Sequence, residues 1–356
     1  MYTRETVRRG ALLCATLLAF GPCVTAVHGY SIIDLGTLGG TTSSARGVND
    51  SGQVVGESAI AGDSTGHAFL YSGGVMTDLG TLGGTSSFAY SINDSGQVVG
   101  KSANHAFLYS GGVMTELGTL GGTSGCAYGI NDSGQVVGHS YIAGNSASHA
   151  FLYSGGAMGD LGTLGGLNSY ASSINSSGQV AGWSHMAGDT SVHAFLYSGG
   201  VMTDLGTLGG LNSWALGINS FGEVVGNFSL SIRDSVRHAF LYSGGVTTDL
   251  GTLGGTHSFA YSINDSGQVV GNSYIAGGSH SHAFLYSGGV MTDLNDLLPP
   301  GSGWTLQRAW AINEAGWIAG QGFGPSGSTH GFLLTPEPTT LSLLALGGLV
   351  VTRRRR

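Results

Sequence analysis

A repeat of about 44 residues constrains the fold of this chain more than any other feature of its sequence. Each copy contains a His-x-Phe motif, an [Asp/Glu]-Leu-Gly-Thr-Leu-Gly-Gly segment and an [Ile/Val]-Asn-x-x-Gly-x-[Val/Ile]-x-Gly motif. Each motif occurs seven times, and the last copy of the glycine-rich segment is degenerate. Successive His-x-Phe motifs are 38 to 48 residues apart. This period suits a blade of four strands or a pair of helices, and it excludes collagen, heptad and short β-helix repeats.

The residue types within the repeat favour strands over helices. The segment His-Ala-Phe-Leu-Tyr is rich in aromatic and branched residues, and Asn-Asp-Ser-Gly is typical of a turn between two strands. Every apolar run that could form a helix meets a pair of glycines within about ten residues, and each glycine would cost a helix interior roughly 1 kcal/mol. We therefore predict four short antiparallel strands per repeat.

The second copy serves as the template for strand boundaries. We predict strands at residues 87–93, 97–102, 105–109 and 113–117. Residues 94–96 turn the chain between the first two strands, and we expect Gly96 to adopt a positive φ there.

The strand of the repeat with which the array begins, and the strand that is missing where it ends, together predict a closed ring. The array begins with a lone copy of the fourth strand, at residues 31–38, and the last unit, residues 309–334, supplies only the first three strands. We predict that the N-terminal strand completes the last sheet, which removes exposed sheet edges. The predicted fold is therefore an all-β, seven-bladed β-propeller at residues 30–335.

Composition and charge narrow the possible partners. With 66 glycines and 9% charged residues in 356, the chain could resemble a disordered one, but its 41% hydrophobic residues recur periodically and favour a folded array. Residues 30–335 hold five of the 12 basic and 18 of the 20 acidic residues, so their formal charge is near −13. Because an acidic ring repels phosphate backbones, we exclude nucleic acid as a partner.

Residues 1–29 have the pattern of a secretory signal peptide. Three arginines precede an apolar run at residues 11–20, which is too short for a comfortable membrane span. Small residues place the cleavage site after Ala26 or after Gly29, and an uncleaved anchor is the alternative. Two of the three cysteines lie in this segment, so the mature chain keeps only Cys126, which we expect to be buried and inert.

The last 21 residues, 336–356, combine a Pro-Glu-Pro motif, an apolar run at residues 341–351 and a basic end. As a helix the run would be roughly 17 Å long, which is shorter than the ~30 Å hydrocarbon core of a bilayer. Because basic residues favour the cytoplasmic side, this segment suits a temporary membrane tether. The residues of this sorting signal are Pro336, Glu337, Pro338, Arg353, Arg354, Arg355 and Arg356.

Two resemblances follow from these motifs. The C-terminal segment resembles a PEP-CTERM protein-sorting signal, which implies processing by an exosortase in a Gram-negative bacterium and release to the envelope or an exopolysaccharide matrix. The repeats, over residues 31–334, resemble HAF-type extracellular repeat proteins, although the seventh copy departs from them at His330-Gly331-Phe332. The second resemblance implies no biochemical activity.

One histidine heads the third predicted strand of every repeat. Copies on different blades would lie too far apart to share a metal ion, because zinc binds its nitrogen ligands at about 2 Å. We instead expect each to bond a backbone or hydroxyl group of its own blade, as a structural repeat position. These residues are His67, His105, His149, His193, His238, His282 and His330.

One carboxylate precedes each Gly-Thr-Leu segment. A catalytic pair needs two carboxylates about 5–10 Å apart with different pKa values, and repeated environments do not separate pKa values. We expect turn or cross-strand hydrogen bonds instead. Calcium binding by the acidic Asn-Asp turns has no specific motif and stays open. The carboxylates are Asp34, Asp78, Glu116, Asp160, Asp204, Asp249 and Asp293.

The connections between the second and third strands vary most in length. They include residues 139–148, 183–192, 227–237 and 272–281. Loops of variable length usually lie at the surface and often bind ligands, although neutral drift is the alternative. The candidate contact residues are His139, Tyr141, Trp183, His185, Met186, Phe228 and Tyr274.

No motif predicts a catalytic residue, a cofactor or a metal ligand. The favoured hypothesis is an exported, non-catalytic matrix, adhesive or surface interaction module. It would lie on the extracellular side of the cell envelope and be transiently anchored in the inner membrane. Its partners would be an exosortase-type enzyme and polysaccharide or other surface proteins. The second hypothesis is a carbohydrate-binding propeller, and the third is a polysaccharide hydrolase or lyase.

Overall fold

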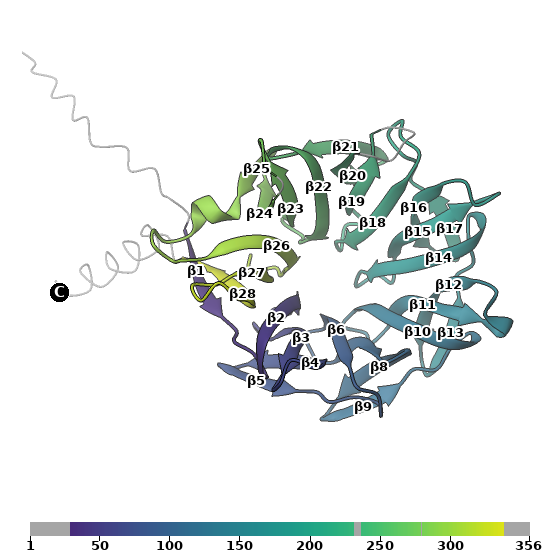
Figure 1. The fold of residues 1–356 in the computed structure, drawn as a ribbon. Helices are drawn as coiled ribbons and strands as arrows, with labels where there is room; N and C mark the ends of the chain where they lie inside the picture. Colours follow the sequence, from purple (N-terminus) through teal and green to yellow (C-terminus); the bar gives the residue numbers. More distant parts are fainter. Residues whose placement is uncertain (1–28, 231–235, 279, 338–356) are drawn as a thin grey trace, which may run out of the picture. The chain divides into compact units, whose positions relative to one another are not determined.

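Seven four-stranded antiparallel sheets, the blades, surround a central opening (Figure 1). This computed structural model describes residues 29–230, 236–278 and 280–337. The predicted all-β, seven-bladed propeller is confirmed. The helical segments of the described residues are two 3-10 turns, η1 (Ala143–Asn145) and η2 (Leu294–Leu297), and none could cross a membrane. Residues 1–28 of the predicted signal peptide, Pro338 and the four terminal arginines lie outside the described residues.

The strands of each blade are ordered from the central opening outward. The first strands are β2 (Gly39–Val48), β6 (Ser87–Ile92), β10 (Gly121–Ile130), β14 (Gly165–Ile174), β18 (Ser213–Ile218), β22 (Gly254–Ile263) and β26 (Thr305–Ile312). The second strands are β3 (Val54–Ile60), β7 (Val98–Ser102), β11 (Val136–Ile142), β15 (Val180–Met186), β19 (Val224–Ser229), β23 (Val269–Ile275) and β27 (Ile318–Phe323).

The outer half of each blade repeats the same order. The third strands are β4 (Gly66–Ser72), β8 (His105–Ser110), β12 (Ser148–Ser154), β16 (Val192–Ser198), β20 (Arg237–Ser243), β24 (Ser281–Ser287) and β28 (Thr329–Pro336). The fourth strands are β5 (Val75–Asp78), β9 (Val113–Glu116), β13 (Ala157–Asp160), β17 (Val201–Asp204), β21 (Val246–Gly251), β25 (Val290–Asp293) and β1 (Tyr30–Asp34). In the template copy the strands match the prediction within two residues at each end.

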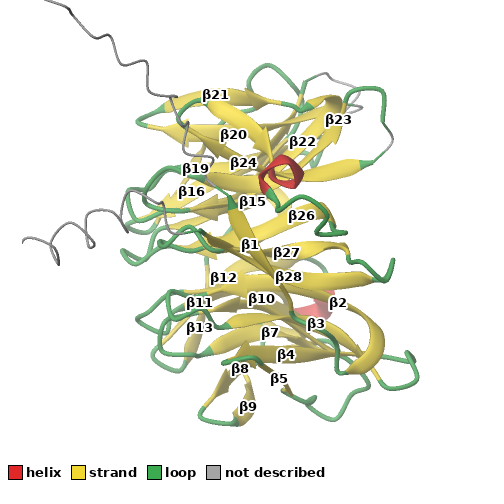
Figure 2. Cartoon of the chain, turned by 90° about the vertical axis from the view of Figure 1, so that its left-hand side faces the viewer, coloured by secondary structure: helices red, strands yellow, loops and turns green. Residues whose placement is uncertain are grey.

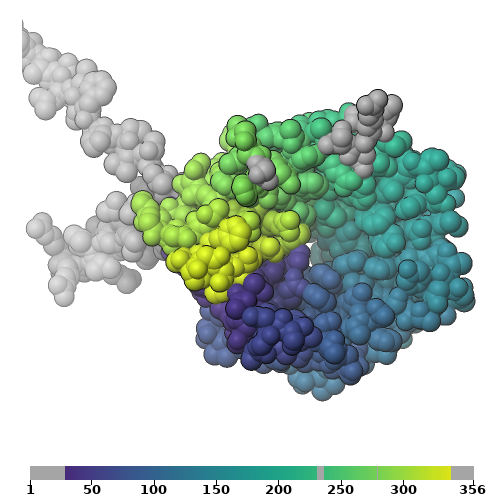
Figure 3. Space-filling model, viewed as in Figure 1, coloured from purple at the N-terminus to yellow at the C-terminus, as the bar shows by residue number. Residues whose placement is uncertain are grey.

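Antiparallel order gives the ring two different faces. The loop face carries the connections between second and third strands and those from each fourth strand to the next blade. The turn face carries the Asn-x-x-Gly turns and the Ser-Gly-Gly turns. In one such turn Gly96 has the predicted positive φ, at 74°. Space-filling atoms leave an opening at the centre of the ring (Figure 3).

The chain closes its ring through β1. This strand lies beside β28 (Figure 2) and pairs with it antiparallel, from Tyr30 opposite Pro336 to Asp34 opposite Phe332. The predicted closure is confirmed, but β1 ends four residues before the expected boundary at residue 38. The Asp34 carboxylate accepts a hydrogen bond from the Gly36 N–H at 2.8 Å, and Gly36 has φ of 72°. This turn directs the chain into β2.

The core lies between neighbouring blades. Third strands each bury one phenylalanine completely or nearly so, between apolar side chains of their own blade and of the preceding one. Within a blade, the first two strands approach so closely beside the core that a Cβ on Gly100 of β7 would collide with the Phe88 carbonyl oxygen of its neighbour β6. This contact explains the terminal glycine of the repeated motif. The seven phenylalanines are Phe69, Phe107, Phe151, Phe195, Phe240, Phe284 and Phe332.

A ring of asparagines joins all seven blades at the turn face. The side-chain Nδ2 of each donates to the backbone oxygen of the equivalent asparagine in the next blade, at 3.0–3.3 Å. Each Oδ1 also accepts from the backbone N–H four residues later, at 2.8–3.0 Å, so the expected turn is present. The members are Asn49, Asn93, Asn131, Asn175, Asn219, Asn264 and Asn313.

Candidate functional site

Each first strand contains a β-bulge at the same position of the repeat. In the first blade, Ala45 pairs with Gly56 and Gly47 pairs with Val55, which leaves Arg46 unpaired. The same interruption occurs in the other six blades. A bulge can redirect a side chain. Here the side chain of the extra residue does not pack between blades but lines the central channel. The seven bulge residues are Arg46, Tyr90, Tyr128, Ser172, Leu216, Tyr261 and Trp310.

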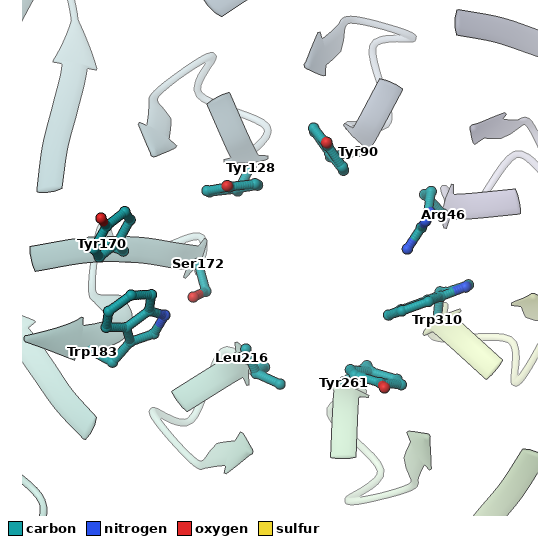
Figure 4. A pocket seen from close by; sticks show the side chains of 9 residues that line it. All are labelled: Arg46, Tyr90, Tyr128, Tyr170, Ser172, Trp183, Leu216, Tyr261 and Trp310. Carbon is teal, nitrogen blue, oxygen red and sulfur yellow. The ribbon is translucent and has the colours of Figure 1, made fainter. Parts of the chain in front are cut away.

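The bulge residues surround a cavity of about 390 Å³, which we call the vestibule. Tyr170 of β14 and Trp183 of β15 complete its lining, so six of its nine residues are aromatic (Figure 4). Both added residues lie on the loop-face side of Ser172, so the vestibule occupies the loop-face end of the channel. Its volume lies in the range typical of small-molecule sites, about 300–1,000 Å³.

Two aromatic walls face each other across the vestibule (Figure 4). On one side Tyr170 and Trp183 stack with ring centroids 4.0 Å apart and planes inclined by 21°. On the other side the Tyr261 and Trp310 centroids are 4.2 Å apart. His139 of β11 lies against the first wall, with its ring centroid 4.8 Å from that of Tyr170.

Hydrogen bonds to second strands hold the Tyr261 and Trp310 rings in place. The Tyr261 hydroxyl donates to Asn272 Oδ1 at 2.7 Å, and Trp310 Nε1 donates to Gln321 Oε1 at 3.3 Å. Since both polar groups are already bonded within the protein, the orientation of each ring is fixed before a ligand arrives. This wall is therefore preorganised.

Arg46 places a positive charge beside the same wall. Its Cζ lies 4.1 Å from the Trp310 ring centroid, and its Nη2 donates to Glu57 Oε1 at 3.2 Å. The buried Arg46 Nε has no hydrogen-bond partner among the described residues, and neither has His139 Nδ1. Because buried polar atoms are normally bonded, the unpaired Nε of the lining residue Arg46 marks the vestibule as a place where a ligand would complete the bonding.

Burial keeps the titratable groups around the vestibule neutral. Burial raises the pKa of Tyr261 to about 12, and it also raises the pKa values of Tyr90 and Tyr128. Burial, with a smaller contribution from Lys101, lowers the pKa of His139 to about 4. At neutral pH the lining thus combines uncharged aromatic rings with the charged Arg46 guanidinium.

Replacing His139 by phenylalanine should make the protein less sensitive to acid. In wild type the folded state disfavours protonation of His139. The stability that depends on neutral His139 is therefore fully present above the unfolded pKa of about 6.5 and is lost as the pH falls toward about 4. The loss should be roughly 3 kcal/mol in the free energy of unfolding. Urea unfolding of both proteins from pH 7 to 4 measures it. Exposed His280, replaced by glutamine, is the control, and parallel pH profiles for wild type and His139→Phe would contradict the assignment.

Beyond the vestibule the channel continues into a smaller cavity, and its far end is lined by polar and acidic residues. A waist of about 200 Å³ is lined by the bulge residues and by small residues after them, such as Gly47, Ser91 and Ala311. The turn-face mouth, about 260 Å³, is lined by four members of the asparagine ring, Asn49, Asn93, Asn131 and Asn313, and by acidic residues. The carboxylates at or beside this mouth accept backbone N–H bonds from the preceding blade. They are Asp50, Asp94, Asp132, Asp265 and Glu314.

The repeated histidines and carboxylates pair with each other. In every blade the histidine Nδ1 lies 2.5–3.0 Å from the carboxylate at the end of the fourth strand, as His67 does with Asp78 and His330 with Asp34. The prediction of a backbone or hydroxyl partner for the histidines was wrong. The hydrogen-bond partner of each histidine Nδ1 is instead the carboxylate for which a turn or cross-strand bond was expected. None of these residues lines the vestibule. Within the described residues no group of three His, Cys, Asp or Glu side chains could hold a metal ion.

The loop candidates are only partly assembled at the vestibule. Trp183 lines the vestibule, and His139 packs against the lining residue Tyr128. Phe228 is 2% exposed and belongs to the core between blades. The predicted loops at residues 139, 183, 227 and 272 in fact begin inside second strands, which run longer than the template copy. Cys126 is buried, and burial raises the pKa of its thiol to about 12.

Sequence reasoning missed the bulge residues, although the repeat contained a signal for them. In Ala-x-[Ser/Gly/Ala]-[Ile/Val]-Asn the second position holds seven residues of five types, while its neighbours stay nearly constant. Four of the seven are aromatic. A variable position inside a constant strand indicates a side chain that is not required for packing.

Comparison with known proteins supports the fold and leaves the activity open. Residues 207–324 match the profile of a family described as "Protein of unknown function (DUF3466)". The comparison with curated proteins found no match.

Solved structures that are similar to this chain include the following two. The β-propeller domain of the Trilobed protease from Pyrococcus furiosus, described as having an open velcro topology, is 11% identical with a TM-score of 0.51; the match covers 72% of this chain and 84% of that one. A TolB-like protein from Agrobacterium tumefaciens is 14% identical with a TM-score of 0.46; the match covers 69% of this chain and 88% of that one. At 11% identity, the likeness to the protease propeller concerns the fold alone.

Proposed function

We propose that this chain is an exported, non-catalytic propeller that binds carbohydrate in its vestibule. The observation that carries the proposal is the pair of aromatic walls, Tyr170 with Trp183 and Tyr261 with Trp310, on opposite sides of one channel. The apolar C–H faces of sugar rings stack on such flat aromatic surfaces, while unpaired polar atoms bond their hydroxyl groups. The asymmetry of the lining favours this second hypothesis over a module that uses seven equivalent surfaces.

The lining favours binding over hydrolysis. Glycosidases of the common type use two carboxylates at a defined separation across the scissile bond. Among the nine described lining residues there is no Asp or Glu, and Glu57, which contacts the lining, is a single carboxylate already paired with Arg46. The proposed role is therefore recognition, in a matrix or at a surface.

Export and sorting belong to the same proposal. The signal-like residues 1–29 and the PEP-CTERM-like segment support passage across the inner membrane, a transient tether and cleavage by an exosortase-type enzyme. Polysaccharide on the extracellular side of the envelope would then be the ligand. Mass spectrometry of the protein in culture medium tests the sorting step, and a chain still ending in Arg356 would refute it.

Removing either wall should abolish most sugar binding. We expect Trp310→Ala or Trp183→Ala to weaken binding of the best ligand on a glycan array at least tenfold, about 1.4 kcal/mol, because each removes one stacking surface. Isothermal titration calorimetry measures the affinities.

Phe221→Ala is the matched control for these variants. Phe221 is a 74% exposed aromatic residue in a turn of the turn face, outside the vestibule. The Phe221→Ala protein should bind the glycan with the same affinity as wild type. An array without a bound glycan, or equal affinities for all three variants and wild type, would refute carbohydrate binding in the vestibule.

A further inference from the structure

Two basic residues of this acidic ring, Arg46 and Arg308, lie beside an aromatic wall of the vestibule. The described residues, 29–230, 236–278 and 280–337, contain four basic residues: Arg46, Lys101, Arg237 and Arg308. Arg46 and Arg308 lie 4.1 and 5.6 Å from the Trp310 ring centroid, and Arg237 lies 4.0 Å from that of Trp214 on β18. Lys101 is near enough to lower the pKa of His139. All four therefore lie beside first-strand or vestibule side chains.

The opposite end of the channel has the opposite charge. Four aspartates and Glu314 surround or adjoin the turn-face mouth, separated from the vestibule by the narrow waist. Beside the channel, guanidinium groups thus lie toward the loop face, where Glu57 pairs with Arg46, and five carboxylates lie toward the turn face. An anion is attracted to the first end and repelled by the second.

We propose that the vestibule selects carboxylate-bearing sugars, such as uronic acids, over neutral ones; this inference rests on the proposed carbohydrate binding. Arg46 supplies the selective contact. One of its Nη atoms bonds Glu57, while its buried Nε has no partner in the described chain. Guanidinium groups have five N–H donors in a plane that matches a carboxylate, so Arg46 retains donors for an acidic sugar bound beside the Trp310 wall.

The same geometry disfavours two other ligands. A quaternary ammonium group would need an aromatic face free of cations, but the Arg46 guanidinium already lies over Trp310. A polyanion threaded through the whole channel would meet the carboxylates of the turn-face mouth. The vestibule therefore takes a chain end or a short acidic segment from the loop face.

Trigalacturonic acid and its fully methyl-esterified form make a matched pair of probes, because they differ in charge and little in shape. We expect the acid to bind at least tenfold more tightly than the ester in calorimetry at 50 mM salt. Raising the salt concentration to 500 mM should weaken binding of the acid and leave that of the ester nearly unchanged, since only the acid makes a screened charge contact.

Variants at Arg46 test the contact itself. Arg46→Met should reduce affinity for the acid to the level of the ester, whereas Arg46→Lys should retain part of the difference. Because Arg46→Met leaves Glu57 without its partner, the double variant Arg46→Met with Glu57→Gln is measured beside it. The double variant should also lose the preference for the acid while its thermal unfolding midpoint stays close to that of wild type.

The outcomes separate this inference from the proposed function. Equal binding of acid and ester, or a preference for the acid that survives in the double variant, overturns acid selection but leaves carbohydrate binding intact. Binding of neutral array glycans alone, sensitive to Trp310→Ala, has the same meaning. If no glycan of either kind binds, the proposed function fails together with the inference.

Discussion

A chain that begins at Gly39, and so lacks β1, should lose most of its stability or fail to remain monomeric. Tyr30 and Leu35 are buried, at 6% and 4% exposure, and five residues of β1 pair with β28. Burying two such side chains contributes roughly 3–6 kcal/mol, at about 1.5–3 kcal/mol each. Whole domains are stable by only about 5–15 kcal/mol. The last blade would also expose the edge of β28, which favours aggregation.

Thermal unfolding and size-exclusion chromatography test this expectation. The matched control is a chain that begins at Gly29 and retains β1. Adding a synthetic peptide of residues 29–38 to the shortened chain should restore part of the lost unfolding midpoint, because the peptide can occupy the vacant edge. If the shortened and control chains unfold at the same temperature and elute as equal monomers, β1 does not close the ring.

Asn131→Ala should cost about 3 kcal/mol or more in the free energy of unfolding. The Asn131 side chain donates to Gln135 Oε1 at 2.8 Å and to the Asn175 carbonyl at 3.0 Å, and it accepts from Gln135 N–H at 3.0 Å. Alanine would leave these buried or half-buried groups unpaired, and each unsatisfied group costs about 1–3 kcal/mol. Chemical denaturation measures the change.

Two further variants at this turn show whether the bond between blades is responsible. Asn131→Asp keeps the shape but turns a donor into an acceptor opposite the Asn175 carbonyl oxygen. It should therefore be at least as destabilised as Asn131→Ala at pH 7 and should recover in part on acidification, when the carboxyl group can donate again. Ser133→Ala, at an exposed position of the same turn, is the control. A cost below about 1 kcal/mol for Asn131→Ala would show that the asparagine ring contributes little.

The architecture could be predicted because repeated residues meet repeated environments. The glycine of each turn, the alternating small and branched residues of the strands, and the unmatched strand at each end all follow from local geometry and from the need to pair sheet edges. The pairing of β1 with the last blade and the positive φ of Gly96 were predictable for that reason. The end of β1 at Asp34 was not predictable, since it depends on the hydrogen bond from the Gly36 N–H to the Asp34 carboxylate in the turn that follows the strand.

The candidate site was largely unpredictable for the opposite reason. Arg46, Tyr90, Tyr261 and Trp310 are tens to hundreds of residues apart, and only a bulge in each first strand points them into one channel. The sequence showed that this position varies, but not that it leaves the packing between blades. Trp183 was proposed as a loop residue, and it reaches the vestibule from within β15 instead.

The amino-acid sequence by itself determined the number of blades, their strand order and the closure by the first strand, because each depends on a motif read along one repeat. Only the tertiary structure decided that the histidines pair with the carboxylates, that seven asparagines bond in a circle, and that two aromatic walls face each other beside a guanidinium group. Those features depend on distances between side chains of different strands or blades, which the folding of the ring sets and which no single repeat contains.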